Sequence, residues 1–221
     1  MGCPMPDYVS RRTMMVDTQV RPSDVTKFPI IRAMLDVPRE AFVPVALKEA
    51  AYVGENLVIA PGRVVLEPRT LAKMLDALDI QGTELVLDVG CGLGYGAAVI
   101  AQLAEAVVAV EEDAVLAAAA QAALGTAGID NAHVVTGPLS QGAAKHGPYD
   151  VILAEGAVEQ VPDALLAQVK EGGRIGCLFM EGALGTCRIG YKHGVAISWR
   201  DIFNASAPVM HGFAKAQEFT L

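Results

Sequence analysis

The chain of 221 residues has only four cysteines, and none of them belongs to a C-x-x-C pair. Cys3, Cys91, Cys177 and Cys187 therefore lack the paired spacing that a zinc site uses, and no metal is expected. Free thiols in a reducing cytoplasm are the simplest interpretation. Cys91 lies between two glycines, where we expect it to fill space. The four histidines are scattered and form no pattern typical of a catalytic base.

Positive charge is also scarce. Seventeen lysines and arginines stand against 25 acidic residues, which gives a net charge of −8 and an isoelectric point near 5.0. A chain of this balance lacks the broad basic footprint of nucleic-acid-binding proteins. We therefore expect no nucleic-acid partner.

No uninterrupted apolar run is long enough for a membrane span, although the mean hydropathy is +0.38. The best candidate, Leu85–Val110, contains two acidic residues, a glutamine and four glycines. Buried strands, a turn and a helix explain it better than one spanning helix. Arg11 and Arg12 are followed by no apolar stretch, so a secretory signal is not expected. These patterns predict a cytoplasmic protein without a membrane partner.

Alternating strand and helix patterns begin near Glu84. We expect strands at 85–89, 106–110, 132–136, 150–154 and 174–180, and helices at 95–104, 113–124 and 162–170. Strands joined by helical crossovers form a doubly wound, mostly parallel, Rossmann-like α/β sheet. After Gly182, extended runs at 186–191, 195–202 and 213–219 predict antiparallel strands that end the sheet.

The first 80 residues differ in composition from the rest of the chain. They carry most of the prolines, and helices are predicted at 24–35 and 70–78. The total length suits one domain with a sizeable core. We expect residues 1–80 to form an N-terminal helical section packed on the same domain as an α/β core of residues 81–221. The oligomeric state stays open.

The most informative segment is Leu85–Gly94, which is followed by an apolar run ending in Glu111. An apolar strand breaks here into Gly90, Gly92 and Gly94, which adopt backbone conformations that other residues resist. Such a turn lets backbone N–H groups approach a ligand, beside the N-terminus of the following helix. Glu111 lies 17 residues past Gly94, near the spacing at which an acidic residue binds ribose hydroxyls. Together these features predict a nucleoside pocket.

The glycine spacing argues against a dinucleotide. A Gly-x-Gly-x-x-Gly fingerprint would need glycine at position 95, where this chain has tyrosine. The sequence Asp-Val-Gly-Cys-Gly-Leu-Gly instead resembles the loop of class I S-adenosylmethionine-dependent methyltransferases. That resemblance implies S-adenosylmethionine as cofactor, with Asp88 and the three glycines on its methionine side and Glu111 on its ribose.

Most of the chain, from about residue 15 to 179, resembles one methyltransferase family. The matching strings are Val37-Pro-Arg-Glu-Ala-Phe-Val-Pro44, Ala51-Tyr52, Gly62 to Pro68, Tyr149-Asp-Val-Ile and Glu171-Gly-Gly-Arg-Ile. The family is protein-L-isoaspartate O-methyltransferase, which methylates the carboxylates of isomerised aspartyl residues and so initiates protein repair. The resemblance implies a protein or peptide substrate, and it assigns no residue a firm catalytic role.

Three positions depart from the family pattern where the acceptor is expected. The family has Gly-Gln-Thr-Ile-Ser-Gln-Pro, whereas this chain has Leu66 at the serine and Glu67 beside it. Leucine offers no hydroxyl group, and Glu67 repels a carboxylate. Glu155, after the strand at 150–154, adds a second acidic candidate at the substrate pocket. Arg63 or Arg69 could neutralise these charges, or a shifted register could leave them in solvent.

A further departure affects the cofactor side: Pro138 replaces the aspartate that would face the adenine amino group. Three hypotheses therefore remain. In the first, the chain is an isoaspartyl repair enzyme with an altered acceptor loop. In the second, it methylates another acceptor, with Glu67 or Glu155 as a base or as the partner of a cationic or hydroxyl group. In the third, it is a non-catalytic relative that binds cofactor or a protein.

Overall fold

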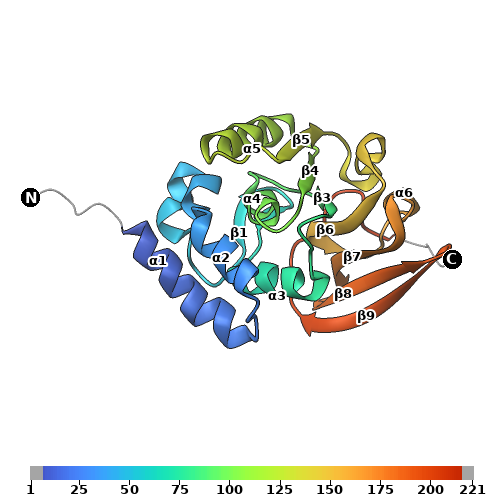
Figure 1. Cartoon of the computed structure of the whole chain (residues 1–221), viewed down its shortest axis with the longest axis horizontal. Helices are drawn as coiled ribbons and strands as arrows, with labels where there is room; N and C mark the ends of the chain where they lie inside the picture. The colour runs from blue at the N-terminus through green and yellow to red at the C-terminus, as the bar shows by residue number, and fades with distance from the viewer. Residues whose placement is uncertain (1–6, 216–221) are drawn as a thin grey trace, which may run out of the picture.

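Seven strands form one mixed sheet at the centre of the protein, in the order β5-β4-β3-β6-β7-β8-β9 (Figure 1). The computed structural model describes residues 7–215. The strands are β3 (Leu85–Val89), β4 (Ala106–Glu111), β5 (Ala132–Thr136), β6 (Tyr149–Val158), β7 (Val169–Glu181), β8 (Leu184–His193) and β9 (Ala196–Asn204). β5, β4, β3, β6 and β7 run parallel, and β8 and β9 are antiparallel additions. The expected doubly wound sheet with antiparallel C-terminal strands is confirmed.

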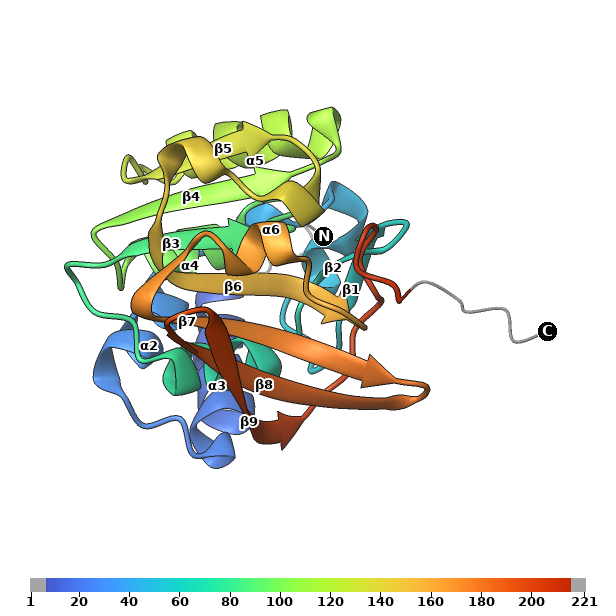
Figure 2. The ribbon, with the colours of Figure 1, turned by 90° about the vertical axis from the view of Figure 1, so that its right-hand side faces the viewer.

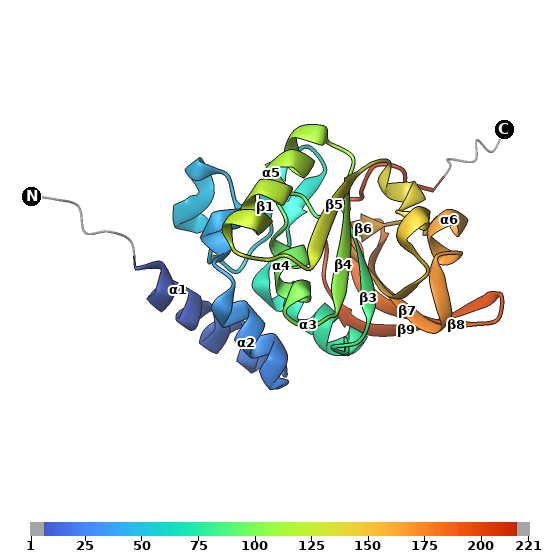
Figure 3. The same cartoon turned by 45° about the horizontal axis from the view of Figure 1, so that its top comes forward.

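Helices cover both faces of this sheet (Figure 3). α3 (Pro68–Leu78), α4 (Tyr95–Ala101) and α5 (Ala114–Thr126) contact one face, and α2 (Phe28–Asp36) packs outside them. The short α6 (Asp163–Leu166) and the segment ending near Phe213 cover the other face. Because each central strand is buried on both faces, its residues are mostly apolar, as in other doubly wound sheets, and the buried acidic residues Asp88, Glu111 and Glu155 are exceptions near the carboxyl ends.

The N-terminal section wraps around the first of these faces. It contains α1 (Tyr8–Met15), a π-helical turn (Val16–Val20) and 3₁₀ turns at Arg21–Ser23, Arg39–Phe42 and Val45–Ala50. It also contains a two-stranded hairpin, β1 (Leu57–Ala60) and β2 (Arg63–Val65), which forms a sheet of its own close to the end of β6 (Figure 2). The hairpin leads directly into α3. No helix in the described part of the chain is both long and apolar enough to cross a membrane.

Two of the expected helices are wrong in extent. The helix predicted at 24–35 begins only at Phe28, because Pro29 cannot donate a helical hydrogen bond and its ring excludes a preceding turn. Asp24 instead has a left-handed backbone with φ of 65°. The helix predicted at 162–170 shrinks to Asp163–Leu166, because Val169 already pairs with Tyr149 in the sheet.

The expected closing strand at 213–219 is also not found in its described part. Phe213 is buried, and its carbonyl accepts hydrogen bonds from the N–H groups of Glu159 and Gln160 at 3.0 Å. An isolated parallel bridge joins Ala157 to Val209 instead. Residues 216–219 of this expectation lie outside the described residues.

Candidate functional site

The glycine-rich turn leaves the carboxyl end of β3 as the sequence predicts. Gly90, Gly92 and Gly94 have φ of 82°, 55° and 89°, a left-handed region that residues with a Cβ rarely adopt. The N–H of Gly90 donates to the Val110 carbonyl oxygen at 2.9 Å. The turn is thereby held against the end of β4, where Glu111 follows Val110.

Glu111 is fully buried and holds the turn with its side chain. Its Oε2 accepts a hydrogen bond from the N–H of Gly92 at 3.0 Å. Its Oε1 accepts from the N–H groups of Glu112 at 2.9 Å and Asp113 at 3.1 Å. The carboxylate is therefore fixed by three backbone donors, at the place where the sequence predicts ribose binding.

Arg63 binds the same carboxylate from the β1–β2 hairpin. Its Nε lies 3.1 Å from each oxygen of Glu111, and its second terminal nitrogen donates to Glu112 Oε1 at 2.6 Å. The Arg63 side chain is only 5% exposed, so this ion pair is shielded from water. An ion pair of Arg63 with Glu67 or Glu155, one of the possibilities that the sequence leaves open, is not the one that forms: Arg63 pairs with Glu111 and Glu112 instead.

Asp88 and Glu155 form a second buried acidic group beside the turn. Val86 and Asp88 share one face of β3, and Leu153 and Glu155 share the same face of β6, because side chains alternate along a strand. No N–H or O–H group of another described residue donates to either Asp88 oxygen or to Glu155 Oε1, and the two carboxyl groups are close enough to share a hydrogen bond when one of them holds a proton. A side chain on Gly96 would collide with the Glu155 carboxylate, so this glycine makes room for it.

Burial dominates the protonation of this pair. It raises the pKa of Asp88 to about 7, and the negative charge of Glu111 contributes to the rise. Burial and then the charge of Asp88 raise the pKa of Glu155 well above its usual range. Uncompensated carboxylates of this kind are costly in a folded protein unless they hold a proton or meet a cation. The pair is therefore suited to a positively charged ligand group.

Arg39, from the Val37–Pro44 string, is a fully buried cation whose charge acts on Glu155. Its Nε donates to the Ala51 carbonyl oxygen at 2.6 Å, and a terminal nitrogen donates to the Leu66 carbonyl oxygen at 2.8 Å. Its guanidinium carbon lies 4.6 Å from the centre of the Tyr95 ring. Arg39 thus ties the segment after β2 to the start of α4.

Leu66 and Glu67 occupy different environments. Leu66 is fully buried, and only its carbonyl oxygen carries a polar interaction. Glu67 stands at the N-cap position of α3 without a side-chain capping bond; its side chain is 27% exposed and accepts a hydrogen bond from Thr70 Oγ1 at 2.6 Å. A terminal nitrogen of Arg69 lies 3.8 Å from Glu67 Oε1, so this expected neutralising pair is present. Glu155, in contrast, is 3% exposed and is not a solvated surface charge.

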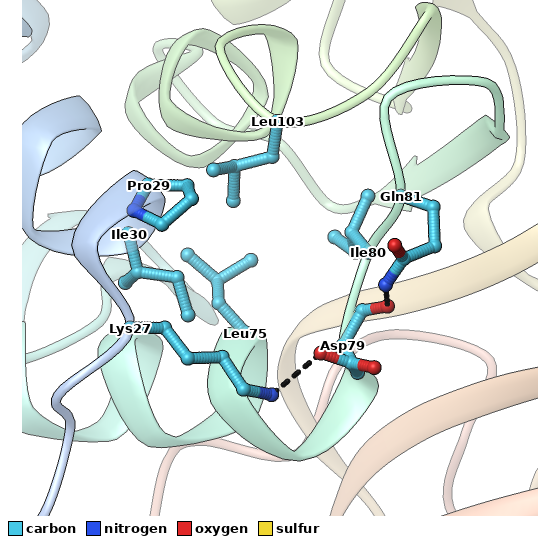
Figure 4. Close-up of a pocket in the computed structure, with 8 residues that line it drawn as sticks. All are labelled: Lys27, Pro29, Ile30, Leu75, Asp79, Ile80, Gln81 and Leu103. Atoms are coloured by element: carbon cyan, nitrogen blue, oxygen red, sulfur yellow. Dashed lines mark hydrogen bonds and ion pairs between the residues drawn. The ribbon is translucent and has the colours of Figure 1, made fainter.

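Two cavities lie near opposite ends of the strands. One of about 360 Å³ adjoins Glu111 and is lined by Ala60, Pro61, Arg63, Glu111, Glu112, Asp113 and Leu116. The other, of about 260 Å³, has an apolar floor closed by the Lys27–Asp79 ion pair (Figure 4). Its residues Ile80 and Gln81 precede β3, whereas the glycine turn follows it. Five residues of strand separate the two by roughly 16 Å, so only the first cavity belongs to the site.

Sequence reasoning missed four residues that shape this site. Arg39 has a usable signal, since it is an arginine inside a mostly apolar string. Tyr95 follows the glycine turn directly, but nothing in the sequence signals its contact with Arg39. Ile59 and Met210 have no signal, because they reach the site only through tertiary packing. A Cβ on Gly92 would lie 2.7 Å from Ile59 Cδ1, and a Cβ on Gly90 would lie 2.9 Å from Met210 Sδ. These two side chains therefore cover the glycine turn.

Comparison with known proteins gives a consistent family. The model of the family Protein-L-isoaspartate(D-aspartate) O-methyltransferase matches residues 11–178. A protein-L-isoaspartate O-methyltransferase of Koribacter versatilis is 40% identical over 164 residues, covering 74% of each chain. A Methylorubrum extorquens protein of the same name is 39% identical over 172 residues, covering 78% of this chain and 75% of the relative.

Solved structures share the fold over nearly the whole chain. A protein-L-isoaspartate O-methyltransferase superimposes with a TM-score of 0.80 at 24% identity, covering 91% of this chain and 66% of that one. A Plasmodium falciparum protein of the same description, in complex with S-adenosyl-L-homocysteine, superimposes with a TM-score of 0.77 at 17% identity, covering 93% and 99%. At these identities the likeness concerns the fold.

Proposed function

Because this chain belongs to the protein-L-isoaspartate(D-aspartate) O-methyltransferase family, we propose that it transfers a methyl group from S-adenosylmethionine to the carboxylate of an isomerised aspartyl residue. The observation that carries the proposal at the site is the Glu111 carboxylate, fixed by the Gly92 N–H at the carboxyl ends of parallel strands. Ligands of open α/β sheets bind at this edge.

The residues at this edge fit the cofactor. The two oxygens of Asp88, which accept no hydrogen bond from an N–H group of residues 7–215, suit the amino group of the methionine part, and Glu111 suits the ribose hydroxyls. The Gly90, Gly92 and Gly94 backbone would run beside the methionine part. The cavity of about 360 Å³ next to Glu111 is large enough to accept part of a nucleoside. When bound, S-adenosylmethionine supplies an electrophilic methyl group.

The role of the protein in such a reaction is alignment and exclusion of water. A carboxylate nucleophile needs no general base, so no side chain has to remove a proton. Arg39 would position the acceptor side by fixing the carbonyl of Leu66, and the buried Tyr95 and Leu66 would keep water out. A reaction that needs only alignment and exclusion of water needs no residue that acts as an acid, base or nucleophile, which is why we assign no catalytic residue.

A second candidate function rests on Glu155. Its buried carboxyl group lies close enough to Asp88 that each changes the pKa of the other, and the raised pKa values mean that this place disfavours negative charge, including that of a further carboxylate. A cationic or hydroxyl acceptor would instead be attracted to it or deprotonated by it. Leu66, which lacks the serine hydroxyl, favours the same alternative.

The test is a titration calorimetry experiment with S-adenosylmethionine and S-adenosylhomocysteine, followed by transfer of a labelled methyl group to an isoaspartyl peptide. The same peptide with ordinary aspartate is the control. Carboxyl methyl esters release labelled methanol in base, whereas N-methyl groups do not. Base-labile label on the isoaspartyl peptide alone is the expected result. Cofactor binding with no transfer to it would contradict the repair function, and base-stable label on an amine acceptor would favour the second candidate.

Two broader proposals complete this function. We infer a cytoplasmic location, which the buried free thiols of Cys91, Cys177 and Cys187 support, and cell fractionation would test it. We also propose that residues 1–80 form a cap that residues 81–221 require. The packing of α3 on β7 and β8 supports this, and a fragment 81–221 that folds alone would contradict it.

A further inference from the structure

Arg63 and the ribose of the cofactor need the same carboxylate. The two oxygens of Glu111 already make five contacts, three with backbone N–H groups and two with Arg63 Nε. A carboxylate offers about four acceptor sites. Glu111 therefore has no acceptor capacity left for a ribose diol while Arg63 is in place.

The hairpin that carries Arg63 also covers the glycine turn. Ile59 on β1 packs against Gly92 so closely that a methyl group there would not fit, and Arg63 begins β2 of the same hairpin. The hairpin thus closes the site through two contacts, that of Ile59 with Gly92 and the ion pair between Arg63 and Glu111. Both would be released by one movement of the hairpin.

Departure of Arg63 would leave Glu111 well held. The N–H groups of Gly92, Glu112 and Asp113 would still fix its carboxylate, and the sites facing Arg63 would become free. Space for a displaced Arg63 side chain is available next to its present position. It lines the adjacent cavity, and its second partner, Glu112, is 28% exposed and can follow the guanidinium toward solvent.

From this geometry we propose that Arg63 competes with S-adenosylmethionine for Glu111, so that it sets cofactor affinity by latching the β1–β2 hairpin closed. The proposal rests on the proposed function, since it presumes a cofactor whose ribose binds Glu111. Arg63 would therefore lower the affinity for S-adenosylmethionine, because the cofactor has to displace it from Glu111. A residue that merely lined the pocket would support binding instead.

The experiment measures S-adenosylhomocysteine binding by calorimetry for the wild type, Arg63→Met and Arg63→Lys. Loss of a competing hydrogen-bonded charge is expected to lower Kd roughly tenfold in Arg63→Met, with a smaller decrease in Arg63→Lys, which keeps the charge but does not bridge Glu111 and Glu112 with two nitrogens. Arg32→Met removes an equivalent charge from an exposed pair with Asp36 and should leave Kd unchanged.

Thermal unfolding provides a second readout. Without ligand, Arg63→Met should unfold at a lower temperature than the wild type, because Glu111 loses its buried counter-ion. The rise in unfolding temperature on adding S-adenosylhomocysteine should be larger in the variant than in the wild type. If Arg63→Met does not fold, the Arg63→Lys comparison decides.

The outcomes separate the two claims. Equal or weaker binding by the Arg63 variants, with a wild type that binds, would overturn the latch and leave the proposed function standing. Binding by a variant but not by the wild type would support both claims. Failure of the wild type and of every variant to bind would overturn the proposed function and the latch with it.

Discussion

The guanidinium of Arg39 joins two carbonyl oxygens that are 15 positions apart in the chain, those of Ala51 and Leu66, at 2.6 Å and 2.8 Å. Arg39 is fully buried, and its face lies over the Tyr95 ring. It therefore holds the segment that enters α3 against the start of α4. This arrangement gives the Val37–Pro44 string a structural role beside the glycine turn.

Arg39→Met should lower the free energy of unfolding by about 2–4 kcal/mol, because two buried carbonyl groups lose their donor. Arg39→Lys should recover only a small part, since an ammonium group does not span both carbonyls in the planar geometry of a guanidinium. Urea unfolding measures both changes. Arg32→Met, at an exposed position, serves as the control. A change below about 0.5 kcal/mol for Arg39→Met would show that the two bonds contribute little.

Glu111→Ala should weaken S-adenosylmethionine binding by about 1–3 kcal/mol, the range for losing hydrogen bonds to a charged acceptor. The Gly92 N–H also loses its partner, so part of the loss comes from a less ordered turn. Calorimetry measures the effect, and Asp130→Ala, at an exposed position before β5, is the matched loss of an acidic charge. An unchanged dissociation constant in Glu111→Ala would mean that the ribose binds elsewhere.

Leu66→Ser combined with Glu67→Gln should raise methyl transfer to an isoaspartyl peptide, by restoring a hydroxyl and removing a like charge. The gain should come with a loss of about 3 kcal/mol in stability, because Leu66 is fully buried. Glutamine at 67 retains an acceptor for the Thr70 hydroxyl. Transfer is measured per folded molecule.

The matched control for this pair is Leu66→Ala with Glu67→Gln, which leaves a similar space without a hydroxyl. If both double variants gain equally, the added volume or the lost charge matters and the hydroxyl does not. If neither double variant transfers more methyl to the isoaspartyl peptide than the wild type, these two positions do not block the acceptor.

Asp88→Asn should change how stability depends on pH. Burial raises the folded-state pKa of Asp88 to about 7, above its ordinary value of 3.8. The folded protein therefore binds more protons than the unfolded chain between these values, and the contribution of Asp88 to stability is lost as pH rises through about 7. Asparagine keeps the shape without the charge.

The variant should consequently gain stability relative to the wild type between about pH 5 and pH 8, by roughly 1–2 kcal/mol. Thermal unfolding across this range measures the difference. Asp130→Asn, whose side chain is exposed, should show no such trend. A constant difference between Asp88→Asn and wild type at all pH values would indicate that Asp88 stays ionised throughout.

Local patterns in the sequence determined the sheet and its turn. Five apolar runs became the parallel strands, and the strand at 132–136 has the predicted bounds. The spaced glycines at 90, 92 and 94 took the left-handed conformations expected of them. These features follow from steric limits and side-chain periodicity within a few residues, so they can be predicted without knowledge of the neighbours.

Only the tertiary structure decided which charged groups meet. It paired Arg63 with Glu111 rather than with Glu67 or Glu155, although 48 positions separate the two residues. It buried Glu155 beside Asp88, and it shortened the helix at 162–170 because Val169 joins the sheet. The partner and the burial of a charged side chain depend on which surfaces the fold brings together. Secondary-structure propensity, which acts over a few residues, carries no information about contacts of this kind.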